Sequence, residues 1–385
     1  MDTAPAASAF ALSEDERAIV GTARDFAVEH VAAHALEWDR DKHFPVDVLR
    51  KGAAMGLGGI YVGEDVGGSG LRRIDAARIF TEIAAACPAT AGYISIHNMV
   101  AWMIDSYGSD EQRRRWLPGL CAMELLGSYC LTEPGAGSDA AALRTRAVRD
   151  GDHYVLDGVK QFISGAGVSD VYVVMARTGA AGPRGISAFV VEKGAEGLSF
   201  GANESKMGWN CQPTRQVILD GVRVPAANLL GGEGSGFAIA MNGLNGGRIN
   251  IAACSLGGAR AAFEQTAGYL REREAFGAPL STSPVLQGRL ADMATDLEAA
   301  RLMLWRAADA LDHDAPDKVT LCAMAKRYVT DAGFAIANEA LQLHGGYGYL
   351  SEYGLEKIVR DLRVHQILEG TNEIMRMIVG RTVAS

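Results

Sequence analysis

Two long stretches in the last third of the chain limit its architecture more than any other feature. Residues 290–311 and 319–343 are rich in alanine and nearly free of glycine and proline, so both favour long helices. A long helix with an apolar face is stable only when that face packs against partners. These stretches therefore predict a four-helix bundle that also packs against other subunits.

The middle of the chain has a different character. Between about Gly127 and Gly236, short β-prone runs are separated by glycine, aspartate and proline. These runs are residues 154–156, 171–175, 186–191 and 216–219. We therefore expect a strand-rich, barrel-like domain in this part of the chain.

Before this segment the pattern is helical again. Ser13 followed by Glu16 has the spacing of a helix-capping box. At 385 residues the chain is too long for a single compact core. We predict a mainly α fold with a central β domain: an N-terminal helical domain (1–126), a middle β domain (127–236) and a C-terminal helical bundle domain (237–385).

The overall charge and the cysteines exclude several classes of protein. The net charge is −9, from 46 acidic and 37 basic residues, which argues against a nucleic-acid surface. The six cysteines form no CxxC pair and indicate reduced, mostly buried thiols. The eight histidines lack metal-ligand spacing, so no metal site is expected.

We expect no contact with a membrane, because no run approaches the roughly 18 apolar residues that a spanning helix needs. The first ten residues are rich in alanine and carry no basic residue, so they resemble a disordered tail and not a targeting segment. The sequence thus predicts a cytoplasmic protein of bacterial type.

One ionisable residue near the C-terminus is the strongest candidate for chemistry. Glu369 follows the apolar pair Ile367-Leu368 and precedes Gly370. A carboxylate held among apolar groups has a raised pKa, in the range that suits a general base. From its position alone, an exposed glutamate at a helix end is the alternative interpretation.

Other motifs could contact a ligand, although each also has an ordinary structural explanation. Residues 129–139 (YCLTEPGAGSD) offer turn amides and hydroxyls to a polar ligand, or form a tight loop. Residues 160–167 could place an aromatic ring against a flat ring system, or form a core strand. Residues 341–349 end a long helix with glycines that would let a ligand approach closely.

A fourth motif is the run Arg271 to Gly277. On a helix, Arg273 and Phe276 would share one face, and the guanidinium could bind a diphosphate. A surface helix end is the alternative.

Together, the order and spacing of these motifs are specific. The stretches YCLTEPGAGSD, FIS, RxxFG, QLHGG and EGTNE resemble the acyl-CoA dehydrogenase family of flavoenzymes, and the resemblance covers essentially the whole chain. It implies the same three-part architecture, FAD as cofactor and an acyl-CoA as substrate. It also implies that FAD is shared between subunits of a homo-oligomer, a tetramer in most of the family (a dimer of dimers).

The resemblance implies a role for individual residues. Glu369 is the catalytic base, and no acid at residues 242–245 competes with it. The implied substrate contacts are Ser138, Asn245, Arg248 and Gly370. The implied FAD contacts are Tyr129, Leu131, Thr132, Gly137, Ser138, Phe162, Ile163, Ser164, Arg273, Phe276, Gln287, Gln342, Gly345, Gly346, Thr371, Asn372 and Glu373.

The implied reaction is α,β-dehydrogenation of an acyl-CoA thioester, with electrons passed to an electron-transferring flavoprotein. The motif LNGGRIN at 244–250 resembles the sequences of enzymes that act on the short branched substrate isobutyryl-CoA. Alternatively, its two glycines simply allow tight helix packing. A straight short-chain (butyryl) or 2-methylbutyryl-CoA dehydrogenase is the alternative. A non-catalytic flavin-binding partner or an oxygen-using enzyme of the same fold is an alternative of another class.

Overall fold

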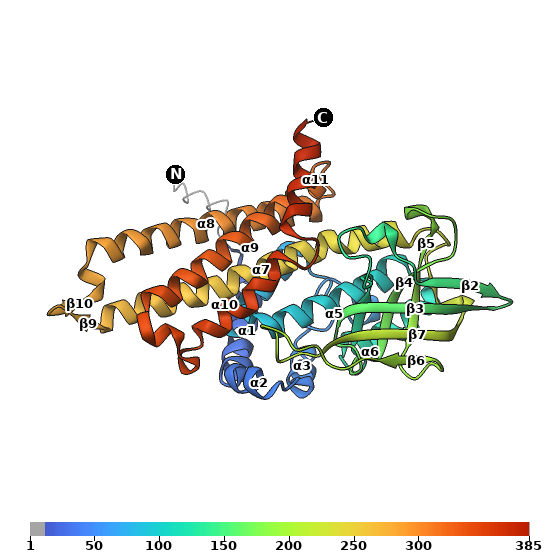
Figure 1. Cartoon of the computed structure of the whole chain (residues 1–385), viewed down its shortest axis with the longest axis horizontal. Helices are drawn as coiled ribbons and strands as arrows, with labels where there is room; N and C mark the ends of the chain where they lie inside the picture. Colours follow the sequence, from blue (N-terminus) through green and yellow to red (C-terminus); the bar gives the residue numbers. More distant parts are fainter. Residues whose placement is uncertain (1–11, 385) are drawn as a thin grey trace, which may run out of the picture.

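The computed structural model describes residues 12–384 and contains the three regions in the expected order. Figure 1 shows an elongated molecule with the β-sheet at one end and the long helices extending to the other. The N-terminal helices lie against both. No helix within 12–384 is at once long enough and apolar enough to cross a membrane. The predicted tail at residues 1–10 lies outside the described residues.

The N-terminal region is helical, as predicted. Ser13 accepts a hydrogen bond from the backbone N–H of Glu16, and the Glu16 side chain accepts one from Ser13, so the capping box is confirmed. The helices are α1 (Glu14–Phe26), α2 (Ala35–Asp41), α3 (Val46–Ala53), α4 (Arg73–Ala86), α5 (Pro88–Tyr107) and α6 (Asp110–Cys121).

The middle region forms one sheet of eight strands in the order β6-β7-β3-β2-β4-β5-β8, with β1 parallel to β4. The four apolar runs lie in β3, β4, β5 and β7, which confirms the predicted strands. The strands are β1 (Gly127–Cys130), β2 (Arg146–Asp150), β3 (His153–Ser164), β4 (Val171–Arg177), β5 (Ile186–Glu192), β6 (Leu198–Phe200), β7 (Thr214–Pro225) and β8 (Leu229–Leu230).

The C-terminal region contains the two predicted long helices. They are α8 (Pro284–Asp312) and α9 (Lys318–Leu343), and both pack against α7 (Gly236–Glu272). Helix α10 (Leu355–Arg363) lies against α9 and α7, and α11 (Asn372–Ala384) contacts α9. A hairpin of β9 (Glu274–Ala275) and β10 (Ala278–Pro279) joins α7 to α8 at the far end of the molecule (Figure 1).

The helical regions share one hydrophobic core. Helix α4 packs along α7 and α8, and its buried Phe80 and Ile83 belong to the same cluster as Ile249 and Cys254 of α7. All six cysteines are buried and unbridged, as the sequence predicted. This shared core brings the first residues of α4 close to the middle of α7, where the candidate site lies.

Candidate active site

Glu369 lies in the turn that joins α10 to α11. Its φ is 56° and that of Gly370 is 88°, so two consecutive residues adopt the left-handed conformation. The residue is half-buried as a whole, but its Oε2 is covered and has no hydrogen-bond partner among the described residues. Burial raises the pKa of Glu369 to about 7, against the opposing charges of Arg248 and Lys326. Glu369 is therefore not the exposed helix-end glutamate of the alternative interpretation, and its role as a general base stays a prediction.

The room for this carboxylate comes from a glycine on α7. A Cβ added to Gly247 would stand 2.5 Å from Oε2 of Glu369 and 2.9 Å from its Cδ. A Cβ added to the preceding Gly246 would stand 2.7 Å from Nη1 of Arg73. The glycine pair in LNGGRIN thus faces two ionisable side chains, and helix packing alone does not account for it.

Arg248 and Asn245 lie one turn of α7 apart and bind each other. Nη1 of Arg248 is 2.7 Å from Oδ1 of Asn245, and its Nε donates to the backbone carbonyl of Glu369 at 3.4 Å. Both side chains are buried. Within the described residues they therefore hold the turn that carries the base, and their contact with CoA stays a prediction.

A second cation, Lys326 of α9, lies on the other side of the turn. Its Nζ donates to the carbonyl of Gly370 at 2.7 Å and to Oδ1 of Asn372 at 2.8 Å. None of the sequence motifs includes this residue. Its signal was a charge on the apolar stripe of a helix, since Cys322, Val329 and Gly333 occupy the same buried face.

Two tyrosines lie within reach of the charge of Glu369. The hydroxyl of Tyr129 is buried without a partner among the described residues, and burial together with the charge of Glu369 raises the pKa of this phenol. Tyr61 accepts a hydrogen bond from Asn250 at 3.0 Å, and the guanidinium of Arg73 stacks 3.6 Å from its ring centre. Sequence reasoning found Tyr129 but neither Tyr61 nor Arg73.

The segments predicted to line a flat cofactor lie side by side. The backbone N–H of Gln161 donates to the carbonyl of Thr132 at 2.8 Å, which joins the loop after β1 to β3. A register shift in β3 places Phe162 at φ 59°, with 64% of the residue exposed. Leu131 and Ile163 are buried, Ser164 is half-buried, and Gly137 and Ser138 are exposed. The exposed ring of Phe162 and the unpartnered hydroxyl of Tyr129 thus lie on adjoining segments, and both groups fit a flavin.

Of the three residues after Gly370, only Asn372 is buried. Its amide donates to Oγ1 of Thr330 at 2.9 Å and to Oδ1 of Asp331 at 2.6 Å, so this side chain is turned toward α9. Thr371 caps α11 by accepting from the N–H of Ile374, and Glu373 is exposed. A flavin contact by these residues stays a prediction.

One local prediction is wrong. Arg273 and Phe276 do not share a helix face, because α7 ends at Glu272 and Arg273 is already extended. Phe276 and Gly277 form the turn of the β9–β10 hairpin with φ values of 54° and 81°, a conformation that the glycine permits. The Arg273 guanidinium instead lies over the ring of Tyr347, 5.4 Å from its centre.

That contact joins two of the predicted motifs at the far end of the bundle. Gly345, at φ 58°, follows the end of α9, as the C-cap pattern predicted. All the residues predicted to bind FAD from another subunit are exposed in this region: Arg273, Phe276, Gln287, Gln342, Gly345 and Gly346. In Figure 1 the β9–β10 hairpin lies at the opposite end of α8 from α11, which follows the Glu369 turn, so the hairpin and that turn do not meet within one chain.

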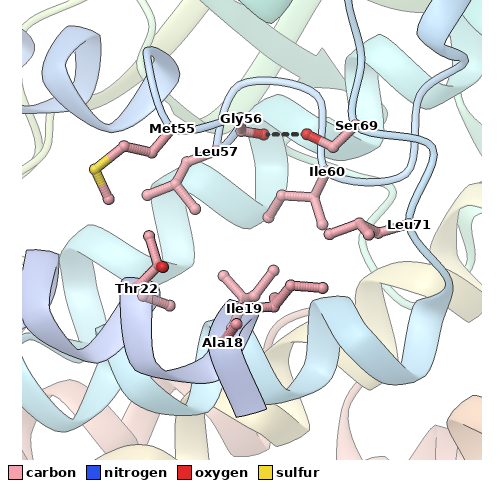
Figure 2. Close-up of a pocket in the computed structure, with 11 residues that line it drawn as sticks. Ala18, Ile19, Thr22, Met55, Gly56, Leu57, Ile60, Ser69 and Leu71 are labelled. Carbon is pink, nitrogen blue, oxygen red and sulfur yellow. Dashed lines mark hydrogen bonds between the residues drawn. The ribbon is translucent and has the colours of Figure 1, made fainter. Parts of the chain in front are cut away.

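A cavity of about 220 Å³ lies elsewhere, between α1, α4 and the loop after α3. Figure 2 shows apolar side chains such as Ile19, Leu57 and Leu71 around it, with the Ser69 hydroxyl donating to the Gly56 carbonyl. Its lining contains no titratable side chain. This cavity therefore offers no group for acid–base chemistry. Within 12–384, moreover, no cluster of three or more His, Cys, Asp or Glu residues could hold a metal ion.

Comparison with known proteins agrees with this geometry. Family models of the acyl-CoA dehydrogenase N-terminal, middle and C-terminal domains match residues 13–124, 128–222 and 234–384. The mitochondrial isobutyryl-CoA dehydrogenase of Bos taurus is 56% identical over 372 residues, which are 97% of this chain and 89% of the relative. The mitochondrial isobutyryl-CoA dehydrogenase of Dictyostelium discoideum is 52% identical over 374 residues, which are 97% and 90%.

Among solved structures, butyryl-CoA dehydrogenase from Megasphaera elsdenii superposes with a TM-score of 0.95 at 35% identity. The match covers 98% of this chain and all of that one (100%). These matches agree with the three-part architecture and with the covered Oε2 of Glu369 in its turn. The chain therefore belongs to the acyl-CoA dehydrogenase family of FAD-dependent oxidoreductases.

Proposed function

We propose that this protein removes the α and β hydrogens of a short branched acyl-CoA, with isobutyryl-CoA as the favoured substrate. The observation that carries the reaction type is the Glu369 carboxyl, which is covered, unpartnered and has a pKa of about 7. The relatives named isobutyryl-CoA dehydrogenase support the acyl group. A mere flavin binder would have no use for such a base.

In this proposal Oε2 of Glu369 accepts the α proton of the substrate. Proton removal leaves negative charge on the thioester oxygen, which needs a hydrogen-bond donor. The backbone N–H of Glu369 has no acceptor among residues 12–384, so it is free to serve as that donor. One turn would thus supply both the base and one arm of the oxyanion hole.

FAD, when bound, accepts the hydrogen that leaves the β carbon with its electron pair. Tyr129, Leu131, Thr132, Gly137 and Ser138 would line one part of it. Phe162, Ile163 and Ser164 would lie against its ring, and Thr371, Asn372 and Glu373 would reach it from the start of α11. Ser138, Asn245, Arg248 and Gly370 would contact the acyl-CoA.

The exposed set at the bundle end supports a site shared between subunits. Arg273 and Phe276 lie at a projecting hairpin, away from Glu369 of the same chain. They would therefore not contact the cofactor bound next to that Glu369. We propose that they, with Gln287, Gln342, Gly345 and Gly346, hold the diphosphate and adenine of a neighbour's FAD. The oligomer would then be a tetramer built as a dimer of dimers.

The electrons would pass to an electron-transferring flavoprotein. A cytoplasmic location is also part of the proposal, although the two closely similar relatives are named as mitochondrial. Selectivity for the acyl group would be modest, since one methylene in an apolar pocket changes binding by about 1–3 kcal/mol.

The test is an anaerobic flavin spectrum of the purified protein with a panel of acyl-CoAs. We expect isobutyryl-CoA to bleach the flavin fastest, with 2-methylbutyryl- and butyryl-CoA slower. Faster bleaching by butyryl-CoA would reject the branched-chain assignment. No bleaching by any of the three would reject the dehydrogenase itself, and rapid reoxidation by air would favour an oxygen-using enzyme.

A further inference from the structure

The turn that carries Glu369 has a backbone that most side chains avoid. Glu369 has a Cβ and yet adopts φ 56°, directly before Gly370 at φ 88°. The left-handed region is sterically disfavoured for a residue with a Cβ, so surrounding contacts must hold it there. The carbonyls of these two residues are the natural points of attachment.

Each carbonyl accepts a hydrogen bond from a buried cation. Nε of Arg248, on α7, lies 3.4 Å from the Glu369 oxygen, and Nζ of Lys326, on α9, lies 2.7 Å from the Gly370 oxygen. The lysine contact is the shorter one. The turn is therefore held between two helices of the bundle, and mainly by α9.

Lys326 holds more than one atom of the turn. Its Nζ also donates to Oδ1 of Asn372 at 2.8 Å, the first residue of α11. Asn372 donates to Oδ1 of Asp331 at 2.6 Å, and the same oxygen accepts from Gln366 at 2.8 Å, three residues before the base. This network reaches both sides of Glu369.

Support of a loop by a buried lysine has a large cost in free energy. Lys326 is fully buried, and the charge on a buried ammonium carries a large desolvation penalty. Apolar residues of similar volume often stabilise a core as well or better. We therefore infer that the positive charge of Lys326 has a role that an apolar side chain could not fill.

We propose that Lys326 is a positioning residue for the proposed dehydrogenation, because it holds the turn that points the Glu369 carboxylate into the space left by Gly247. This inference rests on the proposed function and adds to it a residue that does not touch the reacting atoms. It assigns two roles to one ammonium: the hydrogen bonds fix the turn, and the charge favours the ionised base.

The charged groups that act on Lys326 come from four elements. They are Glu369 in the turn, Arg248 on α7, Asp331 on α9 and Glu373 on α11. Burial lowers the pKa of Lys326 to about 7, while the charge of Glu369 opposes that change. By the same interaction the ammonium lowers the pKa of Glu369. Removing the positive charge must therefore raise the pKa of the base.

The experiment compares Lys326→Met with wild-type holoenzyme. We expect bound FAD to be retained, kcat for isobutyryl-CoA to fall about 100-fold and KM to change little. The acid limb of kcat/KM should move to higher pH by about one unit, because an opposite charge nearby has been lost. A lysine that only braced the loop would leave that limb in place. The matched control is Lys318→Met, the same change in the first turn of α9, where the lysine pairs with exposed Asp314.

A second variant covers the case in which Lys326→Met does not fold. Lys326→Gln retains a hydrogen-bond donor, now a neutral amide, but loses the charge, and it should show the same shift of the acid limb. The inference is overturned if the folded variant keeps kcat within threefold and its acid limb coincides with that of wild type. If wild type itself fails to be bleached by the acyl-CoA panel, the proposed function has failed instead.

Discussion

Burial acts on the carboxyl groups of Glu133 and Glu369, but the two groups have opposite surroundings. Glu133, in the loop after β1, lies 2.8 Å from Nζ of the buried Lys160 and accepts hydrogen bonds from the backbone N–H groups of Arg144 and Thr145. Burial alone would raise its pKa, but Lys160 and these donors outweigh burial and lower it. The Oε2 of Glu369 has no such partner, and the pKa of this residue is raised to about 7.

The difference shows what sets the direction in which the pKa of a carboxyl changes. Burial raises the pKa of both groups, so burial alone does not explain their opposite shifts. What distinguishes them is the supply of hydrogen-bond donors: the cations near Glu369 bind its backbone and the next carbonyl, and leave its Oε2 free. We therefore expect Glu133 to contribute to stability and Glu369 to proton transfer. Four predictions test this comparison.

The largest effect is expected from Glu369→Gln. The amide has nearly the same shape but cannot take a proton, so turnover of isobutyryl-CoA should fall by about 10⁴-fold. FAD absorbance and acyl-CoA binding should persist, which flavin spectra and ligand titration would measure. Activity within tenfold of wild type would mean that another group is the base.

Glu133→Gln should act on stability and not on chemistry. It leaves the Lys160 ammonium buried without its counter-charge, which costs on the order of 3 kcal/mol of unfolding free energy. The midpoint of urea unfolding is the measurement. Turnover per FAD-loaded molecule should stay within a fewfold, and adding Lys160→Met should recover part of the lost stability. A folded variant with normal stability but no turnover would reverse the roles assigned to the two glutamates.

The sequence predicted the regular elements wherever side-chain pattern alone decides the structure. The apolar runs became β3, β4, β5 and β7, which are buried on at least one face. It missed β2, whose residues are mostly exposed and polar, because that strand is fixed by pairing with β3 and not by its own pattern. The hairpin at Phe276 was predicted to be part of a helix. The glycine that indicates a turn, Gly277, comes one residue after Phe276, so the end of the helix was placed too late.

The candidate site divides in the same way. Glu369 and Tyr129 belong to contiguous motifs, so the resemblance located them. Lys326, Tyr61 and Arg73 are isolated in the sequence and reach the site only through the packing of α9, α4 and the loop before α4 against α7. Hydrogen bonds that join residues 326 and 370 depend on tertiary structure, which no local pattern encodes.

The pH dependence of stability should have opposite signs at the two glutamates. A carboxyl whose folded pKa is raised favours folding in its protonated form, so the contribution of Glu369 is complete below its ordinary pKa of 4.5 and is lost as pH rises to about 7. Glu369→Gln should therefore be more stable than wild type at pH 8, by on the order of 3 kcal/mol, and not at pH 4. The contribution of Glu133, whose pKa is lowered, is present above its ordinary pKa and is lost as pH falls. Urea unfolding would measure both slopes, between pH 4.5 and 8 for the Glu369 variant and below pH 4.5 for the Glu133 variant, and equal signs would refute the comparison.

Gly247→Ala tests the room for the unpartnered carboxylate with the smallest possible change. The added methyl would stand 2.5 Å from Oε2, closer than real Cβ contacts allow, so the carboxylate must move. A displacement of about 1 Å in a reacting group can cost roughly 100-fold in rate, and we expect a loss of that size in kcat with FAD still bound. Gly268→Ala is the matched control on the same helix, because nothing lies within 4 Å of its added Cβ. Alanine favours a helix at both positions, so equal activity in the two variants would mean that the carboxylate does not depend on the space at Gly247.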